Sequence, residues 1–325
     1  MSVPYRRQRG VAVVTALLLT TLAVTIVASL FWQQQVQVRS MENQRLHLQT
    51  RWILRGALDW ARLILQQEGK DNRTLTREDG VWATPLAETR LDQYLERERQ
   101  NNETYDATLS GQIYDAQARY NLANLANASK VDNDQVQVFK RLLRNLQLDE
   151  ALALPVAQAV MRARAALPVP TPPPTPSPSP SGSSGSSGSS APLDLIRVED
   201  LLAVPGVTPQ TVERLREFVI VLPPDTKVNA NTARAEVLAA LFETMSVSEA
   251  QTLVVQRKRT AWSNADLVQS TGGDKPAVAV AVRSDNFLVQ SQVRLERAAL
   301  ETWALIRRNP WDQGSLTRPV WIREL

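Results

Sequence analysis

The chain has 325 residues and a formal net charge of +4, and it contains no Cys and a single His, His47. Without Cys it has neither a disulfide framework nor a thiolate nucleophile, and one imidazole excludes zinc sites built from Cys and His. A triad with a histidine base would need His47, which stands in a helix-like stretch next to an apolar segment. Arg6, Arg7 and Arg9 supply most of the net charge, so the remainder is nearly neutral and attracts nucleic acid weakly.

Residues 11–31 form a run without charge, VAVVTALLLTTLAVTIVASLF. At ~1.5 Å per residue, a helix of this length crosses a hydrocarbon core of ~30 Å. Arg6, Arg7 and Arg9 precede the run and predict a cytoplasmic N-terminus, and Trp32 follows it where an interfacial aromatic residue is expected. The sequence therefore predicts a single-pass anchor with most of the chain beyond the membrane.

The alternative to an anchor is a secretory signal peptide. Such a peptide has an apolar region of ~7–15 residues, followed by a cleavage site of small residues. Here the apolar run is longer and continues into a helical pattern without turn residues, and Ala28-Ser29-Leu30 is a poor cleavage signal. A retained anchor is the better interpretation.

The stretch after the anchor, residues 33–67, has no Pro, and from Trp52 onward its apolar residues recur at helical spacing. It predicts one long helix over about 11–67, whose outer half carries an apolar stripe that packs in a core. Residues 105–123 alternate in polarity around Ser110-Gly111 and predict a hairpin. Residues 133–167 have a helical pattern.

A low-complexity segment, PVPTPPPTPSPSPSGSSGSSGSSAP, occupies residues 168–192. Its Pro-rich half favours extended polyproline geometry and its Gly/Ser half is flexible coil, so it is predicted to be a disordered linker. Beyond it, residues 197–223 predict two helices joined by a tight turn at Pro205-Gly206. Thr208 is the expected cap of the second helix, with Pro209 at its first position.

The last third of the chain mixes helical and strand patterns. Residues 228–269 predict three more helices, with starts at Asn231 or Thr232, at Ser246 and at Ser263-Asn264. Residues 277–282 and 286–293 alternate like strands, residues 294–308 carry regularly spaced apolar side chains, and a last strand is predicted at 319–322. These strands are expected to join the sheet begun near residue 107.

Enzymatic motifs are missing from the sequence. No phosphate-binding glycine loop, nucleophile elbow or H-E-x-x-H motif occurs. Close carboxylate pairs such as Glu96/Glu98 and Glu199/Asp200 point to different helix faces and do not converge on one substrate. The protein is therefore predicted not to be an enzyme, and no catalytic residue is assigned.

The two helices around Pro205-Gly206 resemble a helix-hairpin-helix, whose DNA-binding forms present backbone N–H groups to phosphates. Segment 197–223 is not basic, because it contains three Arg and four acidic residues. Thr208 and Pro209 also stand where a second Gly would expose the backbone. Nucleic acid is therefore not an expected partner.

A basic leader ends at Gly10 and is followed directly by the apolar Val11. This resembles the leader of type IV pilins and pseudopilins, which a prepilin peptidase cuts after the Gly. The resemblance implies a mature chain that begins at an N-methylated Val11. Pilins usually carry Glu at the fifth mature position, whereas Thr15 stands here; this is characteristic of the K-type minor pseudopilin. A Glu in hydrocarbon requires a partner, such as the N-terminal amine of a neighbouring subunit, and Thr15 does not.

The strongest resemblance lies within residues 201–241, where LLAVPGVTPQTVERLREFVIVLP is followed by VNANTARAEVLAAL. The order and spacing of these two motifs resemble those of the general secretion pathway protein K family. Two further segments resemble parts of the same family, IYDAQARYNLANLA and SDNFLVQSQVRLERAALETWALIRR. The resemblance covers nearly the whole chain outside the linker. It implies an α+β fold: a pilin-like long N-terminal helix, membrane-spanning at its start, packed on an antiparallel sheet, with a large inserted all-α, helix-hairpin-helix-like domain.

The resemblance also implies a division of the chain into parts. They are a cleaved cytoplasmic leader at 1–10, a long helix at 11–67 that spans the membrane in 11–31, the first part of the pilin-like domain at 68–125, an inserted helical domain at 126–272 that contains the linker 168–192, and C-terminal strands at 273–325 that complete the pilin-like domain.

One departure concerns calcium, which takes about six to eight oxygen ligands. Members of the family commonly carry an acidic stretch after the first helices of the inserted domain, whereas no acidic residue occurs from Met161 to Ala191. The nearest candidates, which a solvated loop explains equally well, are Asp132, Asp134, Asp149 and Glu150. No metal ligand is assigned and no cofactor is expected, with calcium left open.

The resemblance implies a minor pseudopilin of a type II secretion system, which caps or initiates the periplasmic pseudopilus during export of folded proteins. Implied partners are other minor pseudopilins at the tip, the prepilin peptidase, the bacterial inner membrane and secreted protein substrates. The implied location is a single pass through that membrane, with the N-terminus cytoplasmic and the bulk periplasmic. Two alternatives stay open: a DNA-engaging minor pilin of a pilus or competence system, and a membrane-tethered periplasmic scaffold outside any pilus.

Overall fold

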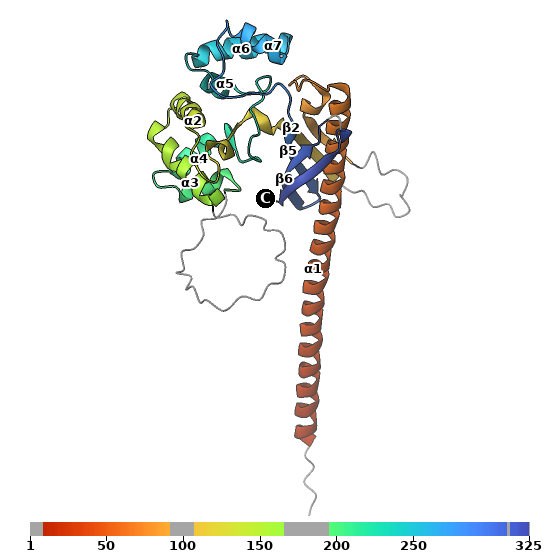
Figure 1. Cartoon of the computed structure of the whole chain (residues 1–325). Coiled ribbons are helices and arrows are strands. Elements are labelled where there is room, and N and C mark those ends of the chain that lie inside the picture. The colour runs from red at the N-terminus through yellow and green to blue at the C-terminus, as the bar shows by residue number, and fades with distance from the viewer. Residues whose placement is uncertain (1–8, 92–106, 166–194, 311–312, 325) are drawn as a thin grey trace, which may run out of the picture.

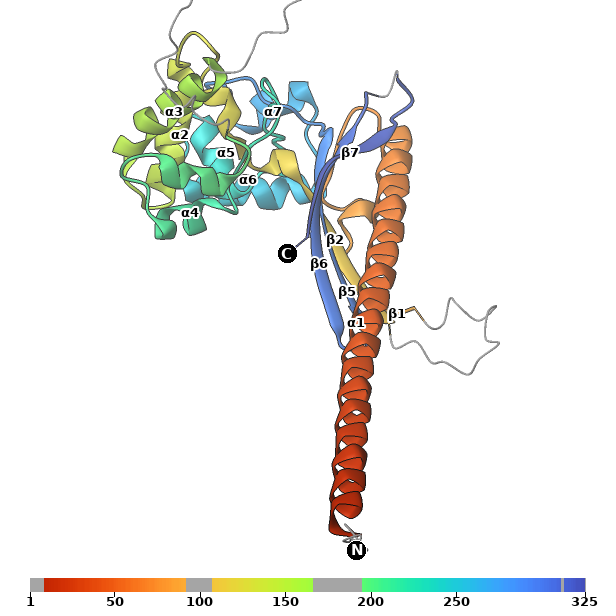
Figure 2. The same ribbon diagram turned by 90° about the horizontal axis from the view of Figure 1, so that it is seen from below.

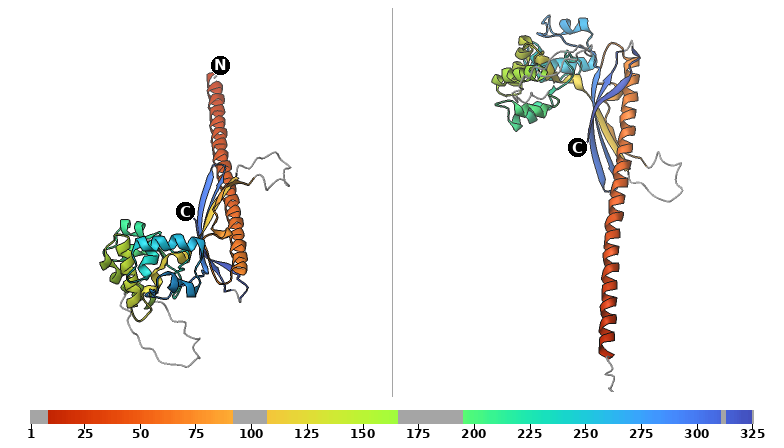
Figure 3. Two further views of the ribbon diagram at one scale, coloured as in Figure 1. Left: turned by 90° about the horizontal axis from the view of Figure 1, so that it is seen from above. Right: turned by 60° about the horizontal axis from the view of Figure 1, so that its bottom comes forward.

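The computed structural model describes residues 9–91, 107–165, 195–310 and 313–324. Its first element is a single helix, α1 (Arg9–Asp71), 63 residues long. At ~1.5 Å per residue, α1 is about 95 Å long. Figures 1 and 3 show its N-terminal half extending away from the rest of the molecule. The predicted helix over 11–67 is confirmed, and it continues by one further turn because no Pro or capping turn stops it before Asp71.

The outer half of α1 packs on one face of a five-stranded antiparallel sheet. The strand order is β1-β2-β5-β6-β7, with the bounds β1 (Leu86–Arg90), β2 (Ala107–Asp115), β5 (Asn286–Leu295), β6 (Ala298–Arg308) and β7 (Thr317–Glu324). Leu58 and Leu65 of α1 are buried against strand residues that include Phe287. The predicted return of the C-terminal strands is confirmed, because β2 pairs with β5 from Ala107↔Leu295 to Asp115↔Phe287.

The predicted hairpin around Ser110-Gly111 is wrong. Both residues lie in the middle of β2, which runs without a turn. A Cβ atom on Gly111 would lie 2.7 Å from the Gln290 carbonyl oxygen of β5. The absence of a side chain at Gly111 therefore allows the two strand backbones to approach closely. A Ser-Gly pair in a strand has the same local sequence signal as a turn, which is why the sequence predicts a hairpin here.

A helical part lies between β2 and β5 in the sequence, and the sheet stands between it and α1 (Figure 2). It has a core of its own, built around Phe139, Leu142 and Leu238. Its regular elements are η3 (Ala116–Ala118), β3 (Tyr120–Asn121), η4 (Leu122–Leu125), α2 (Asn133–Asn145), η5 (Glu150–Leu152), α3 (Ala153–Ala165), η6 (Val198–Ala203), α4 (Pro209–Leu215), β4 (Val219–Ile220), α5 (Ala235–Leu241), α6 (Val247–Arg259) and α7 (Asn264–Ser270). The linker predicted at 168–192 lies outside the described residues, and the predicted domain boundaries stay a prediction.

The turn and several helix starts in this part are confirmed. Gly206 has φ of +90°, which suits a residue without Cβ. Thr208 caps α4 through Thr211 N, and Pro209 is its first residue. Ser246 and Ser263 cap α6 and α7, each in a capping box.

Other predictions for this part are wrong. The first helix of 197–223 is a 3-10 helix, η6, and the second ends at Leu215 because the chain then enters β4, which pairs in parallel with β3. Asn231 and Thr232 cap no helix: both are buried, and α5 starts at Ala235. Residues 277–282 form no strand, only an isolated bridge between Ala281 and Asn229, because their apolar side chains pack on the helical core.

Both edges of the sheet are irregular. The register of β1 against β2 shifts between Leu86 and Thr89. The register of β6 against β7 shifts between Leu305 and Ile306, and Pro319, which has no backbone N–H, lies in β7. Neither edge is therefore a flat, continuous template for another strand.

The capping box of α6 leads to a prediction. Ser246 Oγ accepts from Glu249 N at 3.2 Å, and Glu249 Oε2 accepts from Ser246 N at 2.8 Å. Replacing Ser246 by Ala is expected to lower the free energy of unfolding by about 1 kcal/mol, because an N–H of the first turn loses its acceptor. Denaturant unfolding of the full chain in detergent micelles measures the loss. Gln251→Ala, exposed in the middle of α6, is the control and should leave stability within about 0.5 kcal/mol.

Candidate functional site

The N-terminal part of α1 is long and apolar enough to cross a membrane. Its threonine hydroxyls donate hydrogen bonds to backbone carbonyl oxygens of the same helix. One example is the bond from Thr15 Oγ1 to the Ala12 carbonyl oxygen at 3.0 Å. This keeps a polar group satisfied within an apolar segment. Gly10 and Val11 lie in the first turn of α1. Cleavage between them stays a prediction, as does the assembly role of Thr15.

Beyond the membrane-spanning part, an apolar ridge runs along the face of α1 that points away from the sheet. It consists of Met41, Leu48, Trp52, Trp60 and Leu63, each at least 50% exposed. Their spacing places most of them on one face of the helix. A row of large apolar side chains in water is typical of a surface that another molecule covers. We call these five residues the α1 ridge.

A buried polar joint connects the sheet to the helical part. At its centre the carboxylate of Asp115, the last residue of β2, is 5% exposed. Its Oδ2 accepts from Thr232 Oγ1 at 2.5 Å, from Ser284 Oγ at 2.5 Å and from Asn229 Nδ2 at 3.1 Å. Its Oδ1 accepts from Gln117 N at 2.8 Å. One carboxylate thus connects three segments. They are the segment that leaves β2 at Gln117, the segment within the helical part at Asn229 and Thr232, and the segment that returns to the sheet at Ser284.

The asparagines of the VNANTA motif extend this joint. Asn229 Oδ1 accepts from Asn231 N at 2.9 Å. Asn231 exchanges two hydrogen bonds with the backbone of Trp262, at 2.8 and 2.9 Å. The motif therefore holds the segment before α7 against the end of the sheet. This structural use explains why two asparagines and a threonine are buried there.

Two buried arginines flank the joint. Arg308 Nη2 donates to the Ser284 carbonyl oxygen at 2.6 Å, and Nη1 donates to the Leu65 carbonyl oxygen of α1 at 3.2 Å. Arg257 Nη1 of α6 donates to the Ala230 carbonyl oxygen at 2.6 Å. Burial lowers the pKa of both guanidinium groups from their ordinary value. These contacts fix α1 and α6 to the joint through backbone carbonyls.

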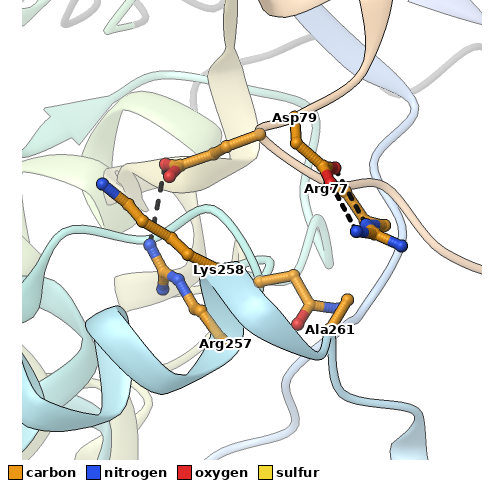
Figure 4. A pocket seen from close by; sticks show the side chains of 7 residues that line it. Arg77, Asp79, Arg257, Lys258 and Ala261 are labelled. Carbon is orange, nitrogen blue, oxygen red and sulfur yellow. Dashed lines mark hydrogen bonds and ion pairs between the residues drawn. The ribbon is translucent and has the colours of Figure 1, made fainter.

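A pocket of about 290 Å³ opens beside Arg257, between α6 and the segment that follows α1 (Figure 4). Arg257 Nη2 lies 3.6 Å from Glu78 Oε1, while Arg77 pairs with Asp79. Burial raises the pKa of Glu78 above its ordinary value, although Arg257 and Lys258 oppose that shift. Glu78 and Arg257 thus form a charge-paired contact between two segments, whereas Arg77 and Asp79 pair within one segment.

Metal chemistry finds no support in the described part of the chain, where no group of three or more His, Asp and Glu side chains could hold an ion. Three of the four acidic residues considered as calcium ligands have structural roles. Asp132 caps α2, Asp149 caps η5, and Glu150 pairs with Arg144 at 2.7 Å. The expectation that no cofactor is needed, with calcium left open, stays untested.

The joint carries a prediction about pH. Burial raises the pKa of Asp115 above its ordinary value, although four hydrogen bonds oppose the shift. The folded state therefore holds the Asp115 proton at pH values where the unfolded state has lost it, so this group's contribution to stability falls as pH rises above 3.8, up to the folded pKa. Comparing Asp115→Asn with the natural chain isolates this contribution, because other acids titrate in both.

The expected result is that the free energy of unfolding of the natural chain falls relative to that of Asp115→Asn as pH rises from about 4 to 6. Urea unfolding of both proteins across that range measures the difference. A constant difference would show that Asp115 has the same pKa in both states.

The architecture places the chain in a structural class: a membrane-anchored, pilin-like protein whose sheet is interrupted by a helical part. Two family models, both described as "Type II secretion system (T2SS), protein K", match residues 118–224 and 228–287, together about half of the chain. The chain belongs to the type II secretion system protein K family.

Relatives and a solved structure agree with this assignment. Type II secretion system protein K of Pseudomonas aeruginosa is 28% identical over 300 residues, which cover 89% of this chain and 86% of that protein. The protein K of Pectobacterium carotovorum is 28% identical over 308 residues, with 89% of each chain covered. A chain in the crystal structure of the GspK-GspI-GspJ complex from enterotoxigenic Escherichia coli has the same fold, with a TM-score of 0.58, 16% identity, and coverage of 88% of this chain and 99% of that chain.

Proposed function

We propose that the protein is a minor pseudopilin that caps or initiates the periplasmic pseudopilus of a type II secretion system during export of folded proteins. Membership of the protein K family supports the system. The similar solved chain comes from a complex whose title names two further proteins, GspI and GspJ. Other minor pseudopilins are accordingly the proposed partners, and the exposed α1 ridge is a surface that such partners would cover.

The proposed location is the bacterial inner membrane, crossed once by the start of α1. Arg6, Arg7 and Arg9 support a cytoplasmic N-terminus by the positive-inside rule. The sheet and the helical part would then lie in the periplasm. The proposed work is mechanical and no reaction is assigned.

One observation carries the capping role: the helical part stands beside the sheet at the end of α1 that is furthest from the N-terminus (Figure 3). A subunit added above this one would meet that bulk. Thr15 supports the same role, because it needs no amine from a neighbour in hydrocarbon.

Removing the helical part tests this role. A chain in which residues 119–280 are replaced by a short Gly/Ser linker is expected to be incorporated along the fibre and not only at its end. Electron microscopy with an antibody label measures its position, and its circular dichroism must match the retained strands. Unchanged fibre length and secretion would contradict the capping role.

The DNA-engaging alternative has less support. Around the turn at Gly206, Arg216 lies 3.2 Å from Glu199 and 3.5 Å from Glu213. A base that is paired with acids attracts phosphate weakly. A mobility-shift experiment at low salt with the full chain in detergent would support this alternative if labelled DNA were retained.

Processing of the leader separates a pseudopilin from a scaffold outside any pilus. The natural chain is expected to begin at methylated Val11, and Gly10→Val is expected to keep its leader, because a branched side chain replaces the small residue at the cleaved bond. Mass spectrometry of the N-terminal peptide distinguishes the two. Thr15→Val is the control and should be processed normally. An intact leader on the natural chain would support the scaffold.

A further inference from the structure

An apolar groove of about 220 Å³ lies between α1 and the β1 side of the sheet. It exists because small residues meet there. Gly111 and Ser291 are opposite each other in the register of β2 and β5, and Ala57 and Ala61 of α1 line the same space. Larger side chains of the adjoining core, such as Trp82 and Ile113, complete its lining. The gap is therefore encoded by residue size.

The lining of the groove determines which molecule it can hold. None of its lining residues is charged, so an ionic ligand would have no counter-ion there. Its volume is below the ~300–1,000 Å³ of a small-molecule site. From Phe31 to Trp60, α1 rises about 43 Å, so a lipid chain in the bilayer does not reach the groove. The uncharged, mainly apolar lining and the small volume suit one large apolar side chain from another protein.

The mouth of the groove is continuous with the α1 ridge. Trp60 belongs to the ridge and lines the groove, as does Val81, which is 76% exposed. A partner that covers the ridge would lie along α1, a shape that suits a second long helix rising from the same membrane. An apolar side chain on that helix would reach the groove as an anchor residue.

We propose that this groove receives one large apolar side chain from a neighbouring pilin-like subunit whose long helix lies along α1. The proposal rests on the proposed function, because it takes the partner to be a fellow subunit. It adds the position and the chemistry of the contact: an uncharged socket beside Trp60 that a single side chain fills.

Photo-crosslinking tests the position. p-Benzoylphenylalanine replaces Val81 in the full chain, in cells that contain the whole secretion system, and mass spectrometry identifies the crosslinked peptide. The expected product joins position 81 to an apolar residue in the long helix of another pilin-like subunit. The matched control is the same probe at Val255 on α6, 59% exposed, which should give no such product. Crosslinks only within the chain or to lipid would overturn the proposal.

Filling the groove tests its use. Ala57→Phe places an aromatic ring in the socket and is expected to weaken association with the crosslinked subunit about thirtyfold, the usual loss of an anchor residue. Val255→Phe is the matched control and should bind as the natural chain does. Thermal unfolding shows whether Ala57→Phe is folded; if it is not, the smaller Ala57→Val takes its place. Undiminished association of a folded filled variant would overturn the proposal.

The socket and the pseudopilin role are tested separately. If Val11 is processed and co-purification with fellow subunits is intact, while both groove experiments fail, the socket is wrong and the pseudopilin role stands. If no pilin-like subunit co-purifies with the natural chain, the proposed function fails as well.

Discussion

Asp115→Ala is expected to lower the free energy of unfolding by about 3–5 kcal/mol, because each buried donor left without an acceptor costs about 1–3 kcal/mol. The change deprives four donors of their acceptor: the backbone N–H of Gln117, the Asn229 amide and the hydroxyls of Thr232 and Ser284. Because these groups are buried, a donor that loses its acceptor keeps the cost of its desolvation. The loss exceeds the relief that comes from no longer burying the carboxylate.

Urea unfolding of the full chain in detergent micelles measures this effect. Asp71→Ala is the matched control, since that carboxylate is exposed at the end of α1, and it should change stability by less than about 0.5 kcal/mol. Limited proteolysis adds a second measure: Asp115→Ala should be cut faster near the two strands that enter and leave the helical part. Equal stability of Asp115→Ala and the natural chain would show that the donors find other acceptors.

Phe139→Ala is expected to destabilise the helical part by about 3–5 kcal/mol, as a cavity forms in a packed core. Phe139 is 0% exposed, and its ring stacks on Tyr120 with centroids 5.7 Å apart. The core around Phe139 shares no buried residue with the core between α1 and the sheet. The damage should therefore be confined to one side of the joint.

Hydrogen exchange resolved by residue measures where the structure opens. Amides of α2 and α5 should exchange faster in Phe139→Ala, and those of β5 and β6 should not change. Val255→Ala, on the exposed face of α6, is the control. Faster exchange in β5 and β6 as well would mean that the two cores unfold as one unit.

The sequence was most informative where the physical signal is local. The long helix followed from an uncharged run that passes into a helical pattern without Pro, and the caps at Ser246 and Ser263 followed from short-range chemistry. The turn predicted at Ser110-Gly111 failed because Gly111 serves a contact with a strand about 180 residues later. No local pattern distinguishes that need from a turn.

The joint illustrates a different limit. The VNANTA motif carries a family resemblance, but local chemistry predicts Asn231 and Thr232 as helix caps, and neither caps a helix. Their true partners, Asp115 and the Trp262 backbone, are distant in sequence. The sequence does not indicate the role of Asp115, because a single acid after a strand carries no sign that it will be buried. Only the topology brings these groups together.

The irregular edges of the sheet have a consequence for how the protein leaves an assembly. A neighbour that added a strand to β1 or β7 would form a ladder of backbone hydrogen bonds, which separates slowly and propagates into aggregates. The register shifts at both edges and Pro319 in β7 oppose such a ladder. A contact at either edge is then restricted to side chains, so a neighbour placed there would not extend the sheet.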